Sequence, residues 1–188
     1  MPCNSSILLS DLQQASRCCV IARSIHLIEM NKINIAEVPT EHRLSPKGRY
    51  ELHRQHISLA LGGIKDKGPW GGGHPFDIEL TQLPPGKANF PMYSHAAQTE
   101  FYIILSGSAI LRGDHDSELR IVAGDHLICH PSDAHQIDND GTEPLVFYVI
   151  TDHHPADVGT YTRTGKRWLS PERRVVAVED ADYYEGEE

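Results

Sequence analysis

Residues 93–107, YSHAAQTEFYIILSG, and residues 124–139, GDHLICHPSDAHQIDN, decide the fold of this chain. Side chains alternate across a β-strand, so in each stretch every second side chain lies on the same face. Tyr93 and His95 therefore share one face. A tight connection to the next strand would bring Glu100 close to His95. The stretches predict neighbouring strands that carry chemically reactive side chains.

Short alternating runs continue around these stretches, and turn residues separate them. The expected strands are 76–80, 101–105, 109–111, 119–122, 126–129, 135–137 and 145–151. No convincing helix interrupts this series. Upstream, the segment from Ile57 to Leu61 predicts one helical turn, closed by Gly62. The pattern is typical of an all-β antiparallel sandwich or barrel.

Two imidazoles and one carboxylate are the candidate metal ligands. His95 and Glu100 are expected to approach each other, and His135 begins a strand after the turn at Pro131. Such a ligand set, with open positions left over, suits a borderline divalent ion and permits catalysis. The sequence therefore predicts one divalent metal ion, such as zinc, iron, manganese or nickel.

At these residues the chain resembles the cupin superfamily, which is defined by two short motifs. The matching positions are His95, Glu100 and Gly107 in the first motif and Gly124, His135 and Asn139 in the second, which runs through Pro131. Each motif occurs once, within residues 76–151. The resemblance implies an all-β fold: a single cupin double-stranded β-helix, or jelly-roll barrel, with N- and C-terminal arms. Segments 73–77 and 164–166 are also similar to small bacterial cupins, some of them sugar-phosphate-isomerase-like.

Three positions depart from the cupin motifs, and one of them is His130, which stands where proline is common. Ser132 replaces a glycine, which need only change the turn because serine is itself a turn former. Tyr93 stands where the family usually supplies its first histidine. It could ligate the metal as a phenolate, donate a hydrogen bond to water or substrate, or fill space; ligation would require the metal to offset a phenol pKa of about 10. We take Tyr93 as the candidate catalytic acid or base.

Two functions are consistent with these residues. The first is a metal-dependent enzyme acting on a small polar metabolite, with isomerase, lyase and dioxygenase chemistry all open, because one barrel hosts many reactions. The second is a non-catalytic cupin that binds a sugar or another small ligand, its metal site partly lost at Tyr93. In the plainest interpretation, His95 and His135 are hydrogen-bonded core histidines of a metal-free barrel.

The composition bears on whether the chain binds nucleic acid or a membrane. The net charge is −9 and no basic cluster is present, which disfavours nucleic acid. There is no apolar run of about eighteen residues and no secretory signal, so we expect no membrane association and a cytoplasmic location. The four cysteines form no CxxC pair and are expected to be reduced thiols. The family resemblance implies a homodimer.

The chain is too short for two independent domains, so we expect one barrel with appended segments. Residues 1–29 are assigned to an N-terminal arm with one short helix, and residues 30–72 to an extension that packs on the barrel. The cupin barrel spans residues 73–152. Residues 153–188 form a C-terminal arm that ends in an acidic tail.

Overall fold

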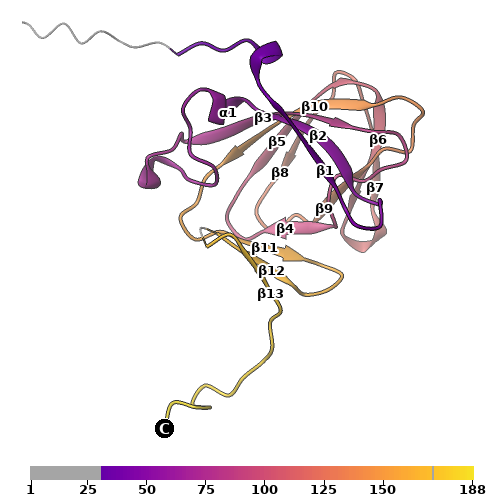
Figure 1. Cartoon of the computed structure of the whole chain (residues 1–188). Coiled ribbons are helices and arrows are strands. Elements are labelled where there is room, and N and C mark those ends of the chain that lie inside the picture. Colours follow the sequence, from indigo (N-terminus) through magenta and orange to yellow (C-terminus); the bar gives the residue numbers. More distant parts are fainter. Residues whose placement is uncertain (1–30, 171) are drawn as a thin grey trace, which may run out of the picture. The chain divides into compact units, whose positions relative to one another are not determined.

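Two antiparallel β-sheets dominate the part of the chain that the computed structural model describes, residues 31–170 and 172–188 (Figure 1). The first sheet has the strand order β1 (Thr40–Leu44), β2 (Glu51–His56), β3 (Phe76–Leu83), β10 (Leu145–Asp152), β5 (Glu100–Ser106) and β8 (His126–Cys129). The second has the order β13 (Arg174–Val176), β12 (Arg167–Leu169), β11 (Val158–Tyr161), β4 (Tyr93–His95), β9 (His135–Asp138), β6 (Ser108–Gly113) and β7 (Glu118–Val122). The helices are the short α1 (Ile57–Ala60), η1 (Ile35–Glu37), η2 (Pro69–Gly71) and η3 (Asp114–Asp116).

All the strands expected from alternation are present, so the all-β prediction is confirmed. α1 is the helical turn expected from Ile57, and Gly62 after it has a φ of +94°, in the left-handed region that glycine adopts without strain. The short helix expected within residues 1–29 lies outside the described residues. Within the described residues, no helix has the length and apolar character needed to span a membrane.

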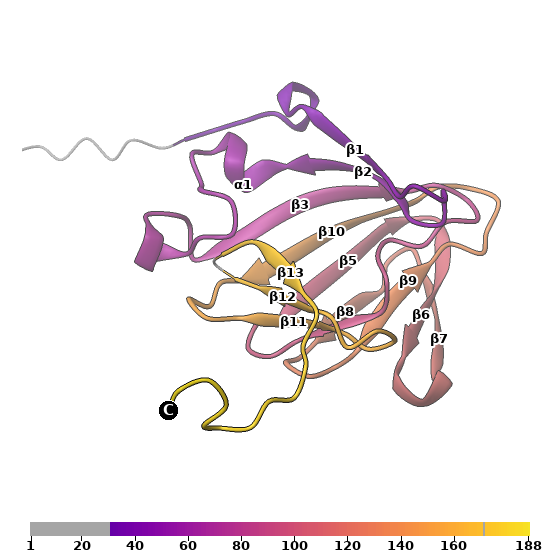
Figure 2. The same cartoon turned by 60° about the horizontal axis from the view of Figure 1, so that its bottom comes forward.

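The two sheets face each other (Figure 2). One apolar core is built from strands of both sheets. Its buried members are Leu83, Tyr102, Ile104, Ala109, Ile121, Cys129, Ile137, Leu145 and Phe147. They come from strands of both sheets and occupy alternate positions, as the period of two requires. Cys129 is a free thiol, as expected; the other three cysteines lie outside the described residues.

Strands β1 and β2 were not expected, because their sequence is polar and basic. Their inner side carries an ion-pair cluster beside the buried Leu52: the buried Arg54 guanidinium contacts Glu41 Oε2 at 2.9 Å and Glu79 Oε2 at 3.1 Å. Buried charges are tolerated when they are paired in this way. At the other end of the chain, β11 pairs with β4. Both sheets thus continue beyond residues 73–152, while the domain boundaries themselves stay a prediction.

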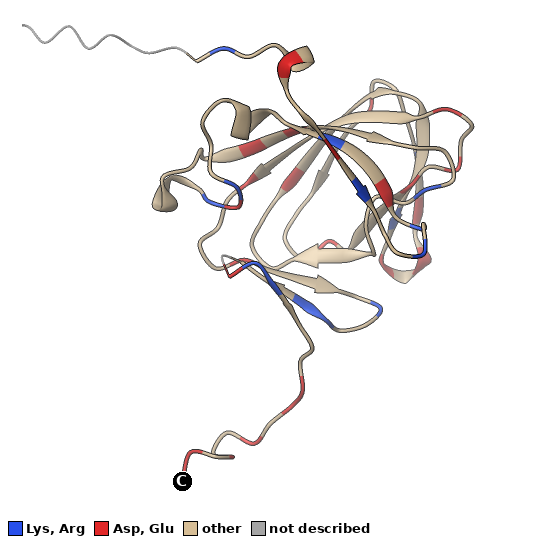
Figure 3. Ribbon diagram, in the orientation of Figure 1, with Lys and Arg blue, Asp and Glu red and all other residues tan. Residues whose placement is uncertain are grey.

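The motif glycine Gly107 lies in the turn between β5 and β6. Its φ is +82°, and an added Cβ would lie 2.6 Å from the carbonyl oxygen of Pro144. Both the backbone conformation and the close approach therefore require glycine. The acidic residues of segment 179–188 follow β13 and lie outside both sheets (Figure 3).

Candidate metal site in the barrel

Tyr93, His95, Glu100 and His135, which the motifs predict as a group, come together inside the barrel. β4 and β9 are neighbours in one sheet, with Tyr93 opposite His135, and a short connection after β4 leads to Glu100 at the start of β5 in the other sheet. Glu100 Oε2 lies 2.7 Å from His135 Nε2, and Glu100 Oε1 lies 3.8 Å from His95 Nε2. Each carboxylate oxygen therefore faces one imidazole.

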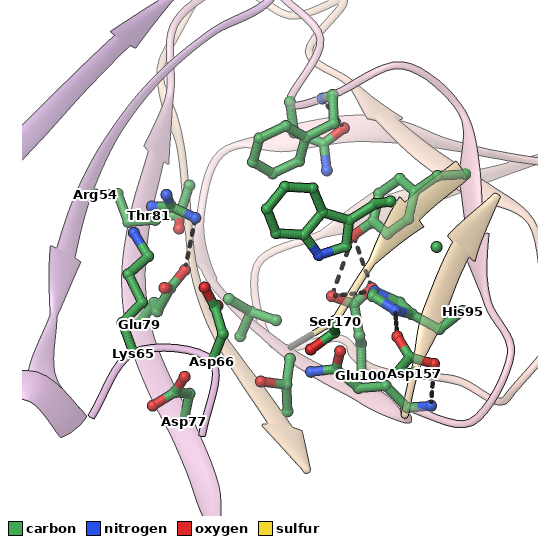
Figure 4. Close-up of a pocket in the computed structure, with 18 of the residues that line it drawn as sticks. Arg54, Lys65, Asp66, Asp77, Glu79, Thr81, His95, Glu100, Asp157 and Ser170 are labelled. Atoms are coloured by element: carbon green, nitrogen blue, oxygen red, sulfur yellow. Dashed lines mark hydrogen bonds and ion pairs between the residues drawn. The ribbon is translucent and has the colours of Figure 1, made fainter. Parts of the chain in front are cut away.

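Asp157 fixes the orientation of the His95 ring. Its Oδ2 atom lies 2.5 Å from His95 Nδ1, and its Oδ1 atom accepts hydrogen bonds from the backbone amides of Ala97 and Gln98 (Figure 4). A carboxylate can only accept, so His95 Nδ1 carries a proton and Nε2 is the nitrogen turned toward Glu100. The sequence motifs do not reveal Asp157, because it follows β10 and lies far along the chain from His95.

The His135 ring is also held by its Nδ1 atom, in this case by a backbone carbonyl group. Its Nδ1 atom lies 3.0 Å from the carbonyl oxygen of Asp133, which leaves Nε2 to face Glu100. The preceding turn contains Ser132 at a φ of +74°, the left-handed conformation for which the cupin motif uses glycine. The Ser132 amide donates to the carbonyl oxygen of His95 at 2.7 Å, so this turn also ties the two histidine segments together.

Two phenols complete the surroundings of Glu100. Tyr93 OH donates to Glu100 Oε1 and Oε2, at 3.1 and 2.9 Å. Tyr102 OH donates to Oε2 at 3.0 Å and lies 3.1 Å from His135 Nε2. Alternation places Tyr102 on the same face of β5 as Glu100. The sequence around Tyr102 nevertheless gives no reason to distinguish it from an ordinary core tyrosine.

Burial and charge act in opposite directions on the central pair. Burial raises the pKa of Glu100, but the hydrogen bond and charge of His135 outweigh it, so the carboxyl pKa is lowered overall. Burial lowers the pKa of His135, but contacts with Cys129 and Glu100 outweigh it and raise that pKa to about 10. The pair is therefore carboxylate and imidazolium near neutral pH. Burial, together with the negative charge of Glu100, raises the pKa of Tyr93 well above its usual value, so the phenol is protonated.

The donor types suit a divalent metal ion, although one ligand atom from each of His95, Glu100 and His135 does not come within 4.8 Å of the other two. Both imidazoles direct Nε2 toward one carboxylate, while their Nδ1 atoms are held by acceptors of the protein, which is how metal-binding histidines are usually oriented. Mixed imidazole and carboxylate donors suit zinc and related ions. At present phenols and an imidazolium satisfy the oxygens of Glu100, so an ion would replace hydrogen bonds already made there.

A cavity of about 420 Å³ opens onto this group. One wall carries His95, Glu100 and Asp157, and the facing wall carries Arg54 and Glu79 from the first sheet (Figure 4). Ligand sites of this size typically combine an apolar lining with a few convergent polar groups. The cavity can therefore admit a small polar molecule to the candidate ligands.

A family of known proteins matches most of the barrel. Residues 79–151 match the family model of the cupin domain. No curated protein matches the sequence.

Several solved structures share the fold. One, from Acidithiobacillus ferrooxidans, is provisionally assigned as a sugar phosphate isomerase; it is 24% identical, with a TM-score of 0.62 over 78% of this chain and 93% of that one. Another, a cupin-superfamily sugar phosphate isomerase from Silicibacter pomeroyi, is 20% identical, with a TM-score of 0.62 over 77% of this chain and 90% of that one. A predicted oxalate decarboxylase from Thermotoga maritima is 21% identical, with a TM-score of 0.53 over 65% of this chain and 99% of that one.

The family match and these structures agree with the motifs and with the two-sheet architecture. Identities of this size establish the fold and leave the reaction open. Residues 79–151 thus match the cupin domain, and the described part of the chain has the double-stranded β-helix fold.

Proposed function

We propose that this chain is a metal-dependent enzyme that acts on a small polar metabolite, with one divalent ion held by His95, Glu100 and His135. The observation that carries the proposal is the orientation of the two histidines. Each turns Nε2 toward a buried carboxylate beside an open cavity, while Nδ1 is held by Asp157 or by the carbonyl oxygen of Asp133. Zinc, iron, manganese and nickel all suit these donors.

The protein groups around the cavity have separate roles in this proposal. The ion would polarise a carbonyl or hydroxyl oxygen of the substrate, or lower the pKa of a bound water. Asp157 holds the His95 ring by Nδ1, so that Nε2 is the nitrogen turned toward Glu100. Tyr93 holds a proton on its phenol oxygen next to Glu100 and is the group placed to deliver it to substrate.

Isomerase, lyase and dioxygenase reactions are all compatible with this arrangement. Two structures of the same fold are described as sugar phosphate isomerases and a third as an oxalate decarboxylase. Sugar phosphates, sugars and small keto acids are therefore the first substrates to test, with the metal identified beforehand.

Metal analysis of tag-free protein tests the proposal directly. Purified chain, and chain stripped with a chelator and reloaded, should bind zinc, iron, manganese or nickel, and Glu100→Gln should lose that ion. Tyr93→Phe should retain the ion and lose turnover. Only trace divalent metal, with no rebinding after its addition, would overturn the proposal.

A non-catalytic binding protein is the second candidate. It is favoured by the full set of hydrogen bonds around Glu100, which includes Tyr93 at the position of the usual first histidine. In that case a sugar or similar ligand would occupy the cavity, and His135→Ala would weaken binding in a protein that has no turnover to lose. Reproducible metal-dependent turnover would eliminate this candidate.

We also propose that the chain forms a homodimer through the outer face of the first sheet. Phe101, Ile103 and Leu105 alternate outward on β5, and Ile128 on β8 lies opposite Phe101; Leu105 and Ile128 are 45% and 51% exposed. Such a patch is typical of a protein interface. Sedimentation should give a dimer mass, and Ile128→Lys should give a monomer; a monomeric wild-type chain would contradict the proposal. A cytoplasmic location and the absence of nucleic-acid partners stay predictions.

A further inference from the structure

A second group of ligand-type side chains lies on the hairpin of β1 and β2. The register of the hairpin places His42 opposite His53, and Glu51 precedes His53 by two residues on β2. All three side chains therefore share one face of the sheet. The alternate β2 residues Leu52 and Arg54 are buried, with 1% and 8% of their surfaces exposed. The group thus faces away from the barrel interior and is separate from the candidate site there.

The three side chains are close enough to share one ion. His42 Nε2 lies 3.1 Å from Glu51 Oε1, and the rings of His42 and His53 lie nearly parallel, with centroids 4.5 Å apart. One ligand atom from each residue lies within 4.8 Å of the other two, and within residues 31–170 and 172–188 no other three histidine, cysteine or acidic residues meet this condition. Bonds of about 2.0–2.2 Å to a common ion bring its ligand atoms this close together. In the barrel, by contrast, His95, Glu100 and His135 would have to move closer to one another to share an ion.

A lysine orients the carboxylate of this group. Lys87 Nζ lies 3.1 Å from Glu51 Oε2 and donates to the carbonyl oxygen of Gly48 at 2.7 Å. Because Oε2 is engaged by the ammonium, Oε1 is the oxygen that faces the imidazoles. The His42 side chain is 49% exposed, so the group is open to solvent and to an incoming ion.

We propose that His42, Glu51 and His53 bind one divalent transition-metal ion on the outside of the hairpin. Two imidazoles and a carboxylate favour ions such as Zn²⁺ or Ni²⁺ over Ca²⁺ or Mg²⁺, and water would fill the remaining positions. β1 is the edge strand of its sheet, paired only with β2. An ion bridging the two strands would therefore stabilise the pairing of β1 with β2 and raise the melting temperature by mass action.

Zinc titration of the metal-free, tag-free chain tests this site separately from the one in the barrel. We expect two equivalents for the wild-type chain, one for His53→Gln, one for Glu100→Gln, and none for the double variant. His42→Gln should behave as His53→Gln. The control is His126→Gln, an exposed histidine on β8 whose Nδ1 lies near a backbone carbonyl; it should keep both equivalents.

The outcomes separate the two proposals. If His53→Gln and His42→Gln bind as many equivalents as the wild type and show the same zinc-dependent rise in melting temperature, the hairpin site is refuted. If the wild type binds one equivalent that His53→Gln loses and Glu100→Gln keeps, the hairpin site stands and the barrel site fails. Circular dichroism of each metal-free variant shows whether a lost equivalent reflects lost ligands rather than lost folding.

Discussion

Replacing Asp157 with asparagine should weaken metal binding in the barrel by changing which nitrogen of His95 carries the proton. The two amides of Ala97 and Gln98 can only donate, so the asparagine oxygen must stay with them and its NH₂ group must face His95 Nδ1. Nδ1 then has to accept, which moves the ring proton to Nε2, the nitrogen assigned to the metal.

The expected loss follows from this one altered contact. Changes in groups that orient metal-binding histidines typically cost about 10- to 100-fold in metal affinity, which corresponds to about 1.4–2.8 kcal/mol. Asp157 is only 3% exposed and its contact with His95 is 2.5 Å, so solvent has little access to this contact. We therefore expect an effect near the upper end of this range.

Equilibrium dialysis with Zn²⁺ in a His53→Gln background measures the barrel site alone. Asp152→Asn is the matched control, because Asp152 accepts a hydrogen bond from the Thr99 amide in the same connection and none from His95. It should leave zinc affinity unchanged. Wild-type affinity in Asp157→Asn, or an equal loss in both variants, would refute the tautomer argument and leave Asp157 as a support for the loop.

Further predictions concern stability. In a chelator, Tyr102→Phe removes the hydroxyl that donates to buried Glu100 and should lower the free energy of unfolding by about 1.5–3 kcal/mol in urea titrations, whereas an unchanged midpoint would contradict its assigned contact. A hydrogen bond to the carboxylate of Glu79 on β3 outweighs burial and raises the pKa of His56. The stabilisation that His56 contributes should therefore be complete below a pH of about 6.5 and be lost as the pH rises through the higher folded-state pKa. His56→Gln should remove this pH dependence from melting curves recorded between pH 6 and pH 9. Gly107→Ala should lower the melting temperature more than Gly86→Ala, because both have positive φ but only the first meets a backbone oxygen; equal shifts would argue against the close approach. Chelation of the wild-type chain should leave its circular dichroism spectrum unchanged, and unfolding would show that an ion is needed for the fold.

The strands could be predicted from the sequence where apolar residues occupy the alternate positions that are buried. The β5 and β10 strands carry β-branched and aromatic residues at alternate buried positions, which is the pattern that sequence reasoning detects. β2 fails the same test because Arg54 occupies an inward position. Its charge is satisfied by Glu41 and by Glu79 of β3, partners that no local pattern reveals.

The candidate site also contains residues that the sequence predicts and residues that it does not. The fixed spacing of the two cupin motifs, together with the fold that they imply, predicts that His95, Glu100 and His135 lie together. Asp157 escapes prediction because its contact with His95 depends on where the chain runs after β10. Tyr102 escapes because its hydroxyl is distinguished only by what lies beside it in the folded barrel.

The hydrogen bonding of Glu100 also limits what kind of metal site this can be. Its charge is balanced by the His135 imidazolium, and both its oxygens accept hydrogen bonds from phenols, so no buried charge is left uncompensated without an ion. A structural metal site, in contrast, has ligands that would be unsatisfied without the ion, and its folding depends on that ion. Here an ion would have to displace a proton and at least one phenol contact to reach the carboxylate. An ion bound at the proposed site would therefore be one that the barrel does not need in order to fold, and Tyr93, the phenol that contacts both oxygens of Glu100, would have to give up contacts for the ion to bind.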